Sequence, residues 1–336
     1  MKYLSQKLSA FILCIGLVLN ACQPGSSNEP VRRTQFIMGT LVEITVSHSD
    51  SKVIQSATTQ AFDEMQRIEQ LMSTYRPDSE ISRINRAAGK EAVPVSPEVE
   101  EVIQEGIFWS KQSSGAFDIT VEPLVQLWDF NGEKEIVPAD STIEKTAALV
   151  NYRNIEIKDH TVRLTQPGMA INVGGLAKGY AVDRAVSILR DKVTSGIINA
   201  GGDLYAFGQK SEGNLWNIGL QHPRKPQAIL AAFAVQNQAV ATSGDYQRYF
   251  IKDGVRYHHI FDPQTGKPAR TMISVTIITT EVMDADALAT AVFVMGPNKG
   301  LEWVDTLENV EAMAVLENGS IFYSKNFQKQ PQFALK

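Results

Sequence analysis

The stretch that decides the fold runs from residue 195 to residue 262 and begins SGIINAGGDLYAFG (195–208). It continues with four more short apolar segments: LWNIGLQHP (215–223), ILAAFAVQNQAVATSG (229–244), RYFIKDG (248–254) and YHHIFD (257–262). Several are bounded by Gly, Asn or Asp, which is typical of strands joined by turns. A run of strands with few helices between them favours an α+β fold over a regular βαβ alternation. We therefore expect mixed, largely antiparallel sheets with packed helices, in a single large domain or two interlocked lobes.

Four segments outside this run predict helices. Apolar residues recur at helical spacing between Lys52 and Met72. Ser96-Pro97-Glu98 supplies an N-cap, a first-turn proline and an early acidic residue, which together indicate the start of a second helix. Helical patterns also extend over residues 178–192 and 284–296. These four helices are the candidates to cover the sheets.

Other segments predict additional strands. Apolar and polar residues alternate in FIMGTLVEITVS (36–47), as in a half-buried strand, and Met38-Gly39-Thr40 lies at its start. A short buried strand is expected over 170–173, and a longer one over 273–280. The pair Asn318-Gly319 predicts a hairpin turn near the C-terminus. Ordered structure is therefore expected to begin near Thr34 and to reach almost to the C-terminus.

The N-terminus has the features of an export signal. Lys2 and Lys7 precede an apolar run of about a dozen residues, which is shorter than the roughly 20 that a membrane-spanning helix needs. The run ends in Leu19-Asn20-Ala21-Cys22, which resembles the lipobox at which a signal is cleaved and the cysteine thiol is acylated. The alternative is a plain secretory signal followed by an incidental cysteine.

This interpretation divides the chain into three parts. Residues 1–21 form a lipoprotein signal peptide, residues 22–33 form a flexible tether that begins at the lipidated Cys22, and residues 34–336 form the folded body. The tether is polar and rich in Pro, Gly and Ser. Since the other cysteine, Cys14, leaves with the signal, no disulfide can form within one chain. The body must then rely on a hydrophobic core, which 43% hydrophobic residues allow.

The charge balance argues against nucleic acid as a partner. The formal net charge is −5, with 32 Lys+Arg against 37 Asp+Glu, and the sequence has no basic block. Any phosphate group bound here must therefore be held by backbone N–H groups, isolated basic residues or a metal ion rather than by a broad positive field.

The sharpest candidate site lies in EVMDADALATAVFVMG (281–296). Asp286 and Thr290 are four residues apart, so they share one face of an otherwise apolar helix. A carboxylate and a hydroxyl are costly to bury without a partner, and a hard cation such as Mg²⁺ prefers such oxygen ligands. In the alternative interpretation, Asp286 caps the helix and Thr290 bonds back to a carbonyl.

Three other segments join turns to polar side chains. Residues 172–183 place a glycine turn before a helix with Lys178 in its first turn, an arrangement that can bind phosphate, although the spacing is neither GxGxxG nor a P-loop. Residues 199–203 (NAGGD) allow close backbone approach. Residues 258–266 hold two of the five histidines beside an aspartate-led turn, so they offer a candidate general base. Each segment also has a structural interpretation: a helix-start turn with a solvated lysine, a bulge, and a core or surface histidine.

Together these motifs resemble the ApbE family, the FAD:protein FMN transferases. The resemblance runs from about Met38 to Gly296 and rests on the order of its motifs: MGT (38–40), STY (73–75), GAFD (115–118), GGLAKGYAVD (174–183), NAGGD (199–203), TSGDY (242–246), HHIFDPQTG (258–266) and DADALATA (284–291). It implies an enzyme that binds FAD, holds Mg²⁺ near its pyrophosphate and joins FMN to a threonine or serine of a target flavoprotein, with release of AMP. Residues 34–336 would be its catalytic domain.

The resemblance also implies the site residues. The metal ligands would be Asp286, Thr290 and a backbone carbonyl near Gly175, and His259 would be the general base. The FAD contacts would be Met38, Tyr75, Ala116, Phe117, Asp118, Asn172, Lys178 and Ile260. Many relatives carry an aspartate where this chain has Asn172, so a hydrogen-bonding role without the charge is expected there.

The resemblance further implies a location and partners. The family is commonly exported and often lipid-anchored, which agrees with the N-terminal signal, so we expect a periplasm-facing protein anchored to a bacterial membrane. Its targets would be exported flavoproteins such as subunits of membrane redox pumps. Two rival functions share the same site. With water as acceptor it would split FAD into FMN and AMP, and a flavin-binding lipoprotein without enzymatic activity would need neither Asp286 nor Thr290.

Overall fold

The computed structural model describes residues 30–336, apart from 129, 131–134 and 211–212. Its centre is an eight-stranded sheet in which every pair of neighbouring strands is antiparallel. In spatial order the strands are β1 (Val31–Ile37), β2 (Thr40–Ser47), β6 (Ser195–Ala200), β7 (Asp203–Phe207), β10 (Gln238–Gly244), β15 (Ser274–Thr279), β16 (Glu311–Val315) and β17 (Ile321–Tyr323). The predicted α+β class with antiparallel sheets is confirmed.

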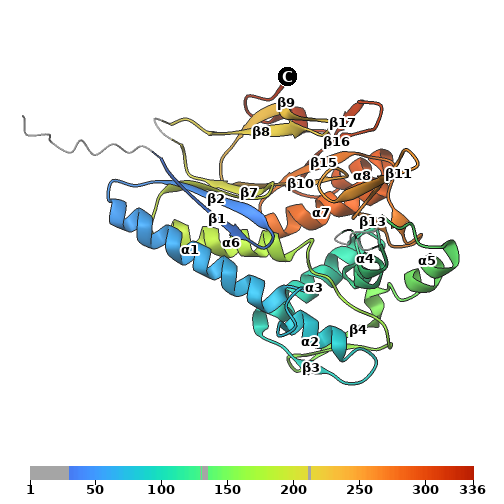
Figure 1. The fold of residues 1–336 in the computed structure, drawn as a ribbon. Helices are drawn as coiled ribbons and strands as arrows, with labels where there is room; N and C mark the ends of the chain where they lie inside the picture. Colours follow the sequence, from blue (N-terminus) through green and yellow to red (C-terminus); the bar gives the residue numbers. More distant parts are fainter. Residues whose placement is uncertain (1–29, 129, 131–134, 211–212) are drawn as a thin grey trace, which may run out of the picture.

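Helices cover one face of this sheet, and a second sheet covers the other (Figure 1). The helices on the sheet are α1 (Ser51–Met72), α6 (Ala177–Arg190) and α7 (Val282–Met295), and α8 (Pro297–Val304) packs against α7. The second sheet contains β8 (Trp216–His222), β9 (Lys225–Val235) and β18 (Ala334–Leu335). Every residue of β15 is buried, including Ser274, Thr276 and Thr279, so both faces of this central strand are covered.

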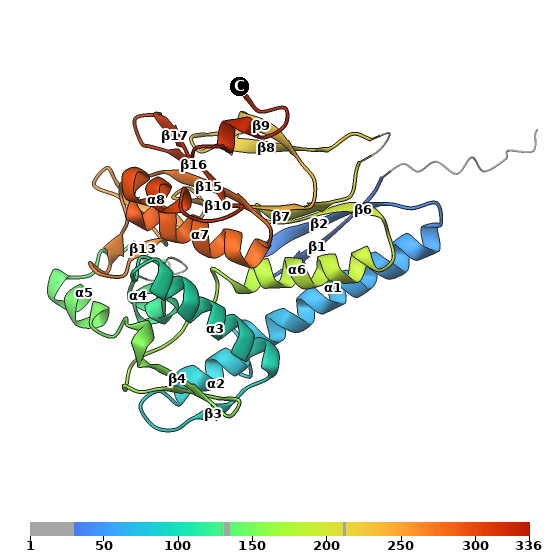
Figure 2. The same cartoon turned by 180° about the vertical axis from the view of Figure 1, so that it is seen from behind.

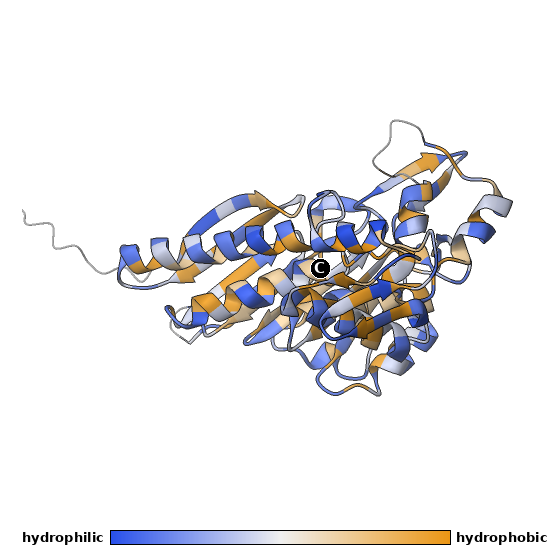
Figure 3. Cartoon of the chain, turned by 90° about the horizontal axis from the view of Figure 1, so that it is seen from below, coloured by the Kyte–Doolittle hydropathy of each residue, from blue (hydrophilic) through white to orange (hydrophobic). Residues whose placement is uncertain are grey.

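The long helix α1 follows the predicted amphipathic pattern. Ile54, Phe62, Met65 and Ile68 are buried beneath it, while Figure 3 shows hydrophilic residues along much of the face turned away from the sheet. The Asp50 side chain accepts a hydrogen bond from the Lys52 N–H and so caps the helix start. Burial of the apolar stripe therefore fixes the orientation of α1 on the sheet.

A further group of mostly short elements lies on the helix-covered side of the main sheet, beyond α1, α6 and α7 (Figure 2). It consists of α2 (Glu80–Arg86), β3 (Val93–Pro94), α3 (Pro97–Gln112), α4 (Glu122–Trp128), α5 (Asp140–Ala147), β4 (Ile155–Lys158) and β5 (Thr161–Leu164). Ile84 of α2 and Val162 of β5 belong to the same continuous core as Ile44 of β2 and Phe293 of α7. Of the two predicted arrangements, a single large domain and two interlocked lobes, this shared core supports the single domain.

Two small hairpins complete the fold near the group of short elements. One pairs β11 (Tyr249–Lys252) with β12 (Val255–His258), and the other pairs β13 (Phe261–Asp262) with β14 (Lys267–Pro268). Phe250 and Phe261 from these hairpins pack with Trp128 and Ile143 in a separate apolar cluster. The predicted strand 257–262 is thus divided between the two hairpins, with His259 and Ile260 between them.

Two other strand predictions differ from the structure. The expected strand 36–47 is a hairpin whose turn is Met38-Gly39, where both residues have positive φ angles, and its first strand begins at Val31 inside the predicted tether. Residues 170–173 do not form a strand. The side-chain amide of Asn85 bonds both the N–H and the carbonyl of Ile171, so this backbone is satisfied without a neighbouring strand.

The predicted signal peptide and Cys22 lie outside the described residues. Within residues 30–336, setting aside the gaps named above, no helix combines the length and the apolar character that crossing a membrane requires.

Candidate active site

The predicted site residues, which come from widely separated segments, line one cavity of about 550 Å³. They are Met38, Tyr75, Ala116, Phe117, Asp118, Asn172, Gly175, Lys178, His259, Ile260, Asp286 and Thr290. The cavity lies between the β1–β2 turn, the starts of α6 and η1 (Ile119–Val121), the end of β10, the hairpin segment after it, and α7. The structure therefore brings together every residue that the resemblance implied.

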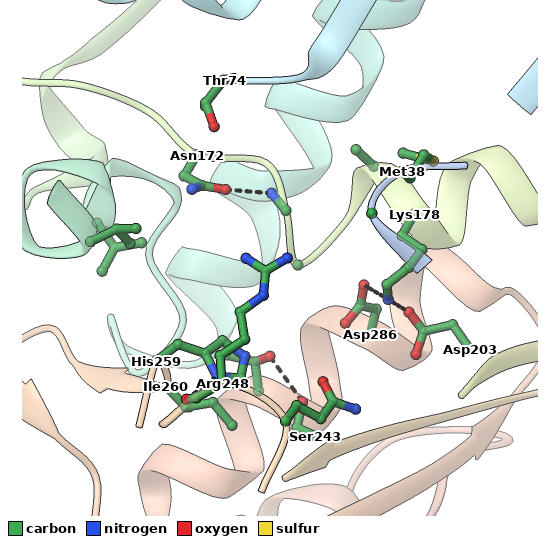
Figure 4. A pocket seen from close by; sticks show the side chains of 18 of the residues that line it. Met38, Thr74, Asn172, Lys178, Asp203, Ser243, Arg248, His259, Ile260 and Asp286 are labelled. Carbon is green, nitrogen blue, oxygen red and sulfur yellow. Dashed lines mark hydrogen bonds and ion pairs between the residues drawn. The ribbon is translucent and has the colours of Figure 1, made fainter. Parts of the chain in front are cut away.

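The most charged wall of the cavity joins α6 to α7 (Figure 4). Lys178 Nζ lies 3.3 Å from Oδ2 of Asp286 and also forms an ion pair with Asp203 at the start of β7. Asp286 is 8% exposed, and burial raises the pKa of its carboxyl group while the ammonium of Lys178 acts in the opposite direction. Two carboxylates thus share one ammonium, which leaves a formal charge of −1 in this corner when all three are ionised.

Asp286 does not cap α7. The helix begins at Val282 after Glu281, so Asp286 lies within the second turn and faces the cavity. Thr290 follows one turn later, and its hydroxyl lies 3.2 Å from that of Ser243 on β10. The alternative interpretation of Asp286 as a helix cap is therefore wrong.

The groups around Asp286 fit a magnesium ion. They are hard oxygen donors, and Gly175 brings the backbone close to them: a Cβ added there would lie 3.9 Å from Thr290 Oγ1 and a tight 3.0 Å from the Phe117 ring. Among the described residues, no group of three or more His, Cys, Asp or Glu side chains could hold a metal ion. The donors beside Asp286 are a carboxylate and a hydroxyl, and Mg²⁺ is usually bound by one or two carboxylates together with substrate phosphates and water.

The glycine turn before α6 is held by Asn172. Its side-chain oxygen accepts a hydrogen bond from the Gly174 N–H at 2.7 Å, and its side-chain N–H donates to Glu122 at 2.6 Å. Glu122 is buried, and burial raises the pKa of its carboxyl group while the Asn172 bond acts to lower it. Asn172 therefore shapes the turn, and no local pattern pointed to its partner Glu122.

The carboxylate of Asp118 is buried and hydrogen-bonded to neighbouring residues of the protein. Its carboxylate accepts hydrogen bonds from the N–H and hydroxyl of Thr120 and from the N–H of Tyr152. Burial raises the pKa of this carboxyl group, and these hydrogen bonds oppose the rise. Asp118 thus fixes the loop that carries Ala116 and Phe117 into the cavity wall.

The cavity wall favours His259 among the candidate bases, because His259 lines the cavity and neither His258 nor Asp262 does. Burial, with the neighbouring His258 and Arg248, lowers the pKa of His259 to about 4, so its imidazole is neutral at pH 7. His258 is buried outside the cavity wall, where its ring bonds the backbone of Ala269 and Ile260. Asp262 closes its turn by accepting from Gln264 N–H and Thr265.

Several cavity residues were missed in the sequence. Arg248 projects into the cavity between Asn172 and Ser243 (Figure 4), and its guanidinium donates to the Tyr75 hydroxyl at 3.4 Å. Asp203 and Ser243 belong to the motifs NAGGD and TSGDY, which could have pointed to them. Arg248 follows the second of these motifs by two residues, and no local pattern distinguishes it from a surface arginine.

Comparison with known proteins agrees with this geometry. A FAD:protein FMN transferase of Treponema pallidum is 30% identical over an alignment of 326 residues that covers 90% of this chain and 89% of the relative. One of Klebsiella pneumoniae is 33% identical over 304 residues, 89% of this chain and 93% of the relative. The crystal structure of the ApbE protein of Thermotoga maritima superposes with a TM-score of 0.84 at 36% identity, covering 90% of this chain and 100% of that one.

A second solved structure, the flavin transferase ApbE of Vibrio cholerae, gives a TM-score of 0.81 at 30% identity over 90% of this chain and 99% of its own. Residues 38–314, from the β1–β2 turn to β16, match the ApbE family itself. The chain therefore belongs to the ApbE family.

Proposed function

We propose that this protein transfers the FMN part of FAD to a serine or threonine hydroxyl of a target flavoprotein and releases AMP. The observation that carries the proposal is the single cavity in which Asp286, Thr290 and His259 meet the predicted flavin contacts. The names of the relatives, FAD:protein FMN transferases, support the same reaction. FAD is the substrate rather than a permanently bound cofactor.

Different residues of the cavity would bind the phosphates and the metal ion in this reaction. Lys178 and Arg248 line the cavity, where their positive charges would face the pyrophosphate of FAD. Asp286, Thr290 and the Gly175 backbone would hold a magnesium ion, which supplies further positive charge to the phosphates as the bond to AMP breaks. Phosphoryl-type transfer depends mostly on such positioning and charge neutralisation.

The acceptor step needs one proton to move. The acceptor oxygen attacks the phosphorus of the FMN half, the P–O bond to AMP breaks, and AMP leaves with its phosphate. The hydroxyl proton passes to a nitrogen of His259, which is neutral at pH 7 and lies in the same cavity.

One experiment tests this function directly. The purified protein is incubated with FAD, Mg²⁺ and candidate exported flavoproteins, and intact-mass spectrometry measures the mass added to each candidate. Transfer predicts the addition of one FMN phosphoryl unit to a serine or threonine, together with one AMP. Release of FMN and AMP with no modified protein, even with every candidate present, would identify a hydrolase instead.

The N-terminal sequence supports a location for this activity. The apolar run before Cys22 and the polar stretch 23–33 fit a lipid-anchored protein that faces the periplasm. Exported flavoproteins, including subunits of membrane redox pumps, are then the accessible targets.

A further inference from the structure

The start of α7 is packed unusually closely against α6. Gly179 and Asp183 are four residues apart, so they lie on the same face of α6. A Cβ at Gly179 would lie 2.5 Å from the carbonyl oxygen of Val282 and 2.6 Å from Cα of Met283. Only a glycine at this position lets the first turn of α7 reach the surface of α6.

The carboxylate of Asp183 completes this contact. One oxygen accepts the N–H of Val282 and the other accepts the N–H of Met283, both at 2.9 Å. The first N–H groups of a helix have no partner within the helix, and the N-terminus favours negative charge. The residue that should cap α7 locally, Glu281, makes no side-chain cap bond. A residue of α6 therefore caps α7.

This cap joins the two helices that carry Lys178 and the candidate metal ligands Asp286 and Thr290. Asp286 follows Met283 by three residues, less than one turn, and Lys178 lies next to Gly179 on α6. Any shift or rotation of the first turn of α7 would thus change the distance between Asp286 and Lys178. Asp183 itself does not line the cavity.

We propose that Asp183 is a positioning residue, whose carboxylate holds the start of α7 against α6 so that Asp286 and Thr290 face Gly175 and Lys178 at the spacing that magnesium binding requires. This inference rests on the proposed function. It assigns Asp183 to the geometry of the metal ligands and not to contact with FAD or the acceptor.

The test begins with Asp183→Asn, which keeps the volume but replaces one acceptor oxygen by an N–H₂ group that cannot accept. Hydrogen exchange at the Val282 and Met283 amides should become faster in the protein without ligands. Mg²⁺ affinity in the presence of FAD, measured by calorimetry, should fall by about tenfold or more, as for other groups that support a metal ligand. FAD binding without Mg²⁺ should be unchanged.

A second variant perturbs the same contact without touching Asp183. The methyl group of Gly179→Ala would push the first turn of α7 away, so Mg²⁺ affinity should fall in the same way. The matched control is Asp50→Ala, which removes the cap at the far end of α1 and should lower stability without changing Mg²⁺ affinity.

The outcomes separate this inference from the proposed function. Normal Mg²⁺ affinity in folded Asp183→Asn or folded Gly179→Ala would overturn the positioning role, as would an equal loss in the Asp50→Ala control. If neither variant folds, Asp183→Ser, which keeps one acceptor, takes their place. Normal Mg²⁺ affinity in that variant would equally overturn the positioning role. Failure of the wild-type protein to modify any acceptor would instead count against FMN transfer.

Discussion

Lys178 Nζ lies 3.3 Å from Oδ2 of Asp286 while it also pairs with Asp203, so one ammonium from α6 is shared by two buried carboxylates from α7 and β7. Without a bound cation, this ammonium is the nearest positive charge to Asp286. A metal ion beside Asp286 would add charge to a corner that is formally negative. Asp286 would then lie beside two cations, the Lys178 ammonium and the metal ion, while Asp203 keeps the ammonium alone.

Replacing Lys178 by Met should destabilise the protein, because two buried carboxylates lose their common partner. Removing one member of a buried ion pair costs about 3–5 kcal/mol, and here part of that cost should be recovered when a metal ion binds. We expect Mg²⁺ to raise the Tm of Lys178→Met more than that of the wild type in thermal unfolding. Equal Tm shifts in the two proteins would exclude this electrostatic link.

Asp286→Asn should weaken Mg²⁺ binding and FMN transfer while leaving the fold intact, because one ligand charge is lost with little change in volume. The loss of affinity should be at least about 100-fold, the upper end of what removing a supporting group costs. Magnesium titration of transfer activity measures it. Asp284→Asn is the matched control, since Asp284 bonds Trp109 outside the cavity and should leave the magnesium requirement unchanged.

His259→Ala should lower the transfer rate by roughly 10²–10⁴, the usual loss for a general base, with FAD affinity close to that of the wild type. Since the pKa of His259 is lowered to about 4, its neutral form persists as pH falls from 8 to about 5. In the wild type, protonation of His259 should therefore not lower kcat/KM between pH 8 and about pH 5. A normal rate in the variant would place the base elsewhere.

The carboxyl group of Glu105 predicts a pH dependence of stability. Burial, and then the neighbouring Asp284, raise its pKa to about 7 in the folded protein. The fold therefore favours the protonated form, and its contribution to stability is lost as pH rises from about 4.5 to about 7. In urea unfolding, Glu105→Gln should be more stable than the wild type at pH 8 and similar to it near pH 4.5. Glu302→Gln, at an exposed position of α8, should show no such difference.

Cys22→Ser tests the predicted lipid anchor. The serine cannot be acylated on sulfur, so the variant should be exported in soluble or uncleaved form, and its catalytic body should keep wild-type activity. Metabolic labelling with a fatty acid checks the first expectation and the FMN transfer assay checks the second. Normal labelling of the variant would refute the lipobox.

The local sequence predicted much of the fold because its signals depend on near neighbours. The alternation around Val42, Ile44 and Val46 marks one buried face of β2, and the observed burial alternates as predicted. Ser96 caps α3 as its position before Pro97 indicated, and Asn318-Gly319 forms the predicted turn. Strand period, caps and turns are properties of a few consecutive residues, so they can be found without knowing the fold.

Tertiary structure decided what these elements do with their polar groups. Residues 170–173 have the composition of a buried strand, yet the side chain of Asn85, on α2, satisfies the backbone of Ile171. The ordered motifs identified Asp286 and Lys178 as site residues, but nothing local indicated that Asp203 would share the ammonium or that Asp183 would cap α7. Such contacts join residues far apart in the chain, and they form only because burial of the apolar faces of α6 and α7 on one sheet brings those groups within bonding distance.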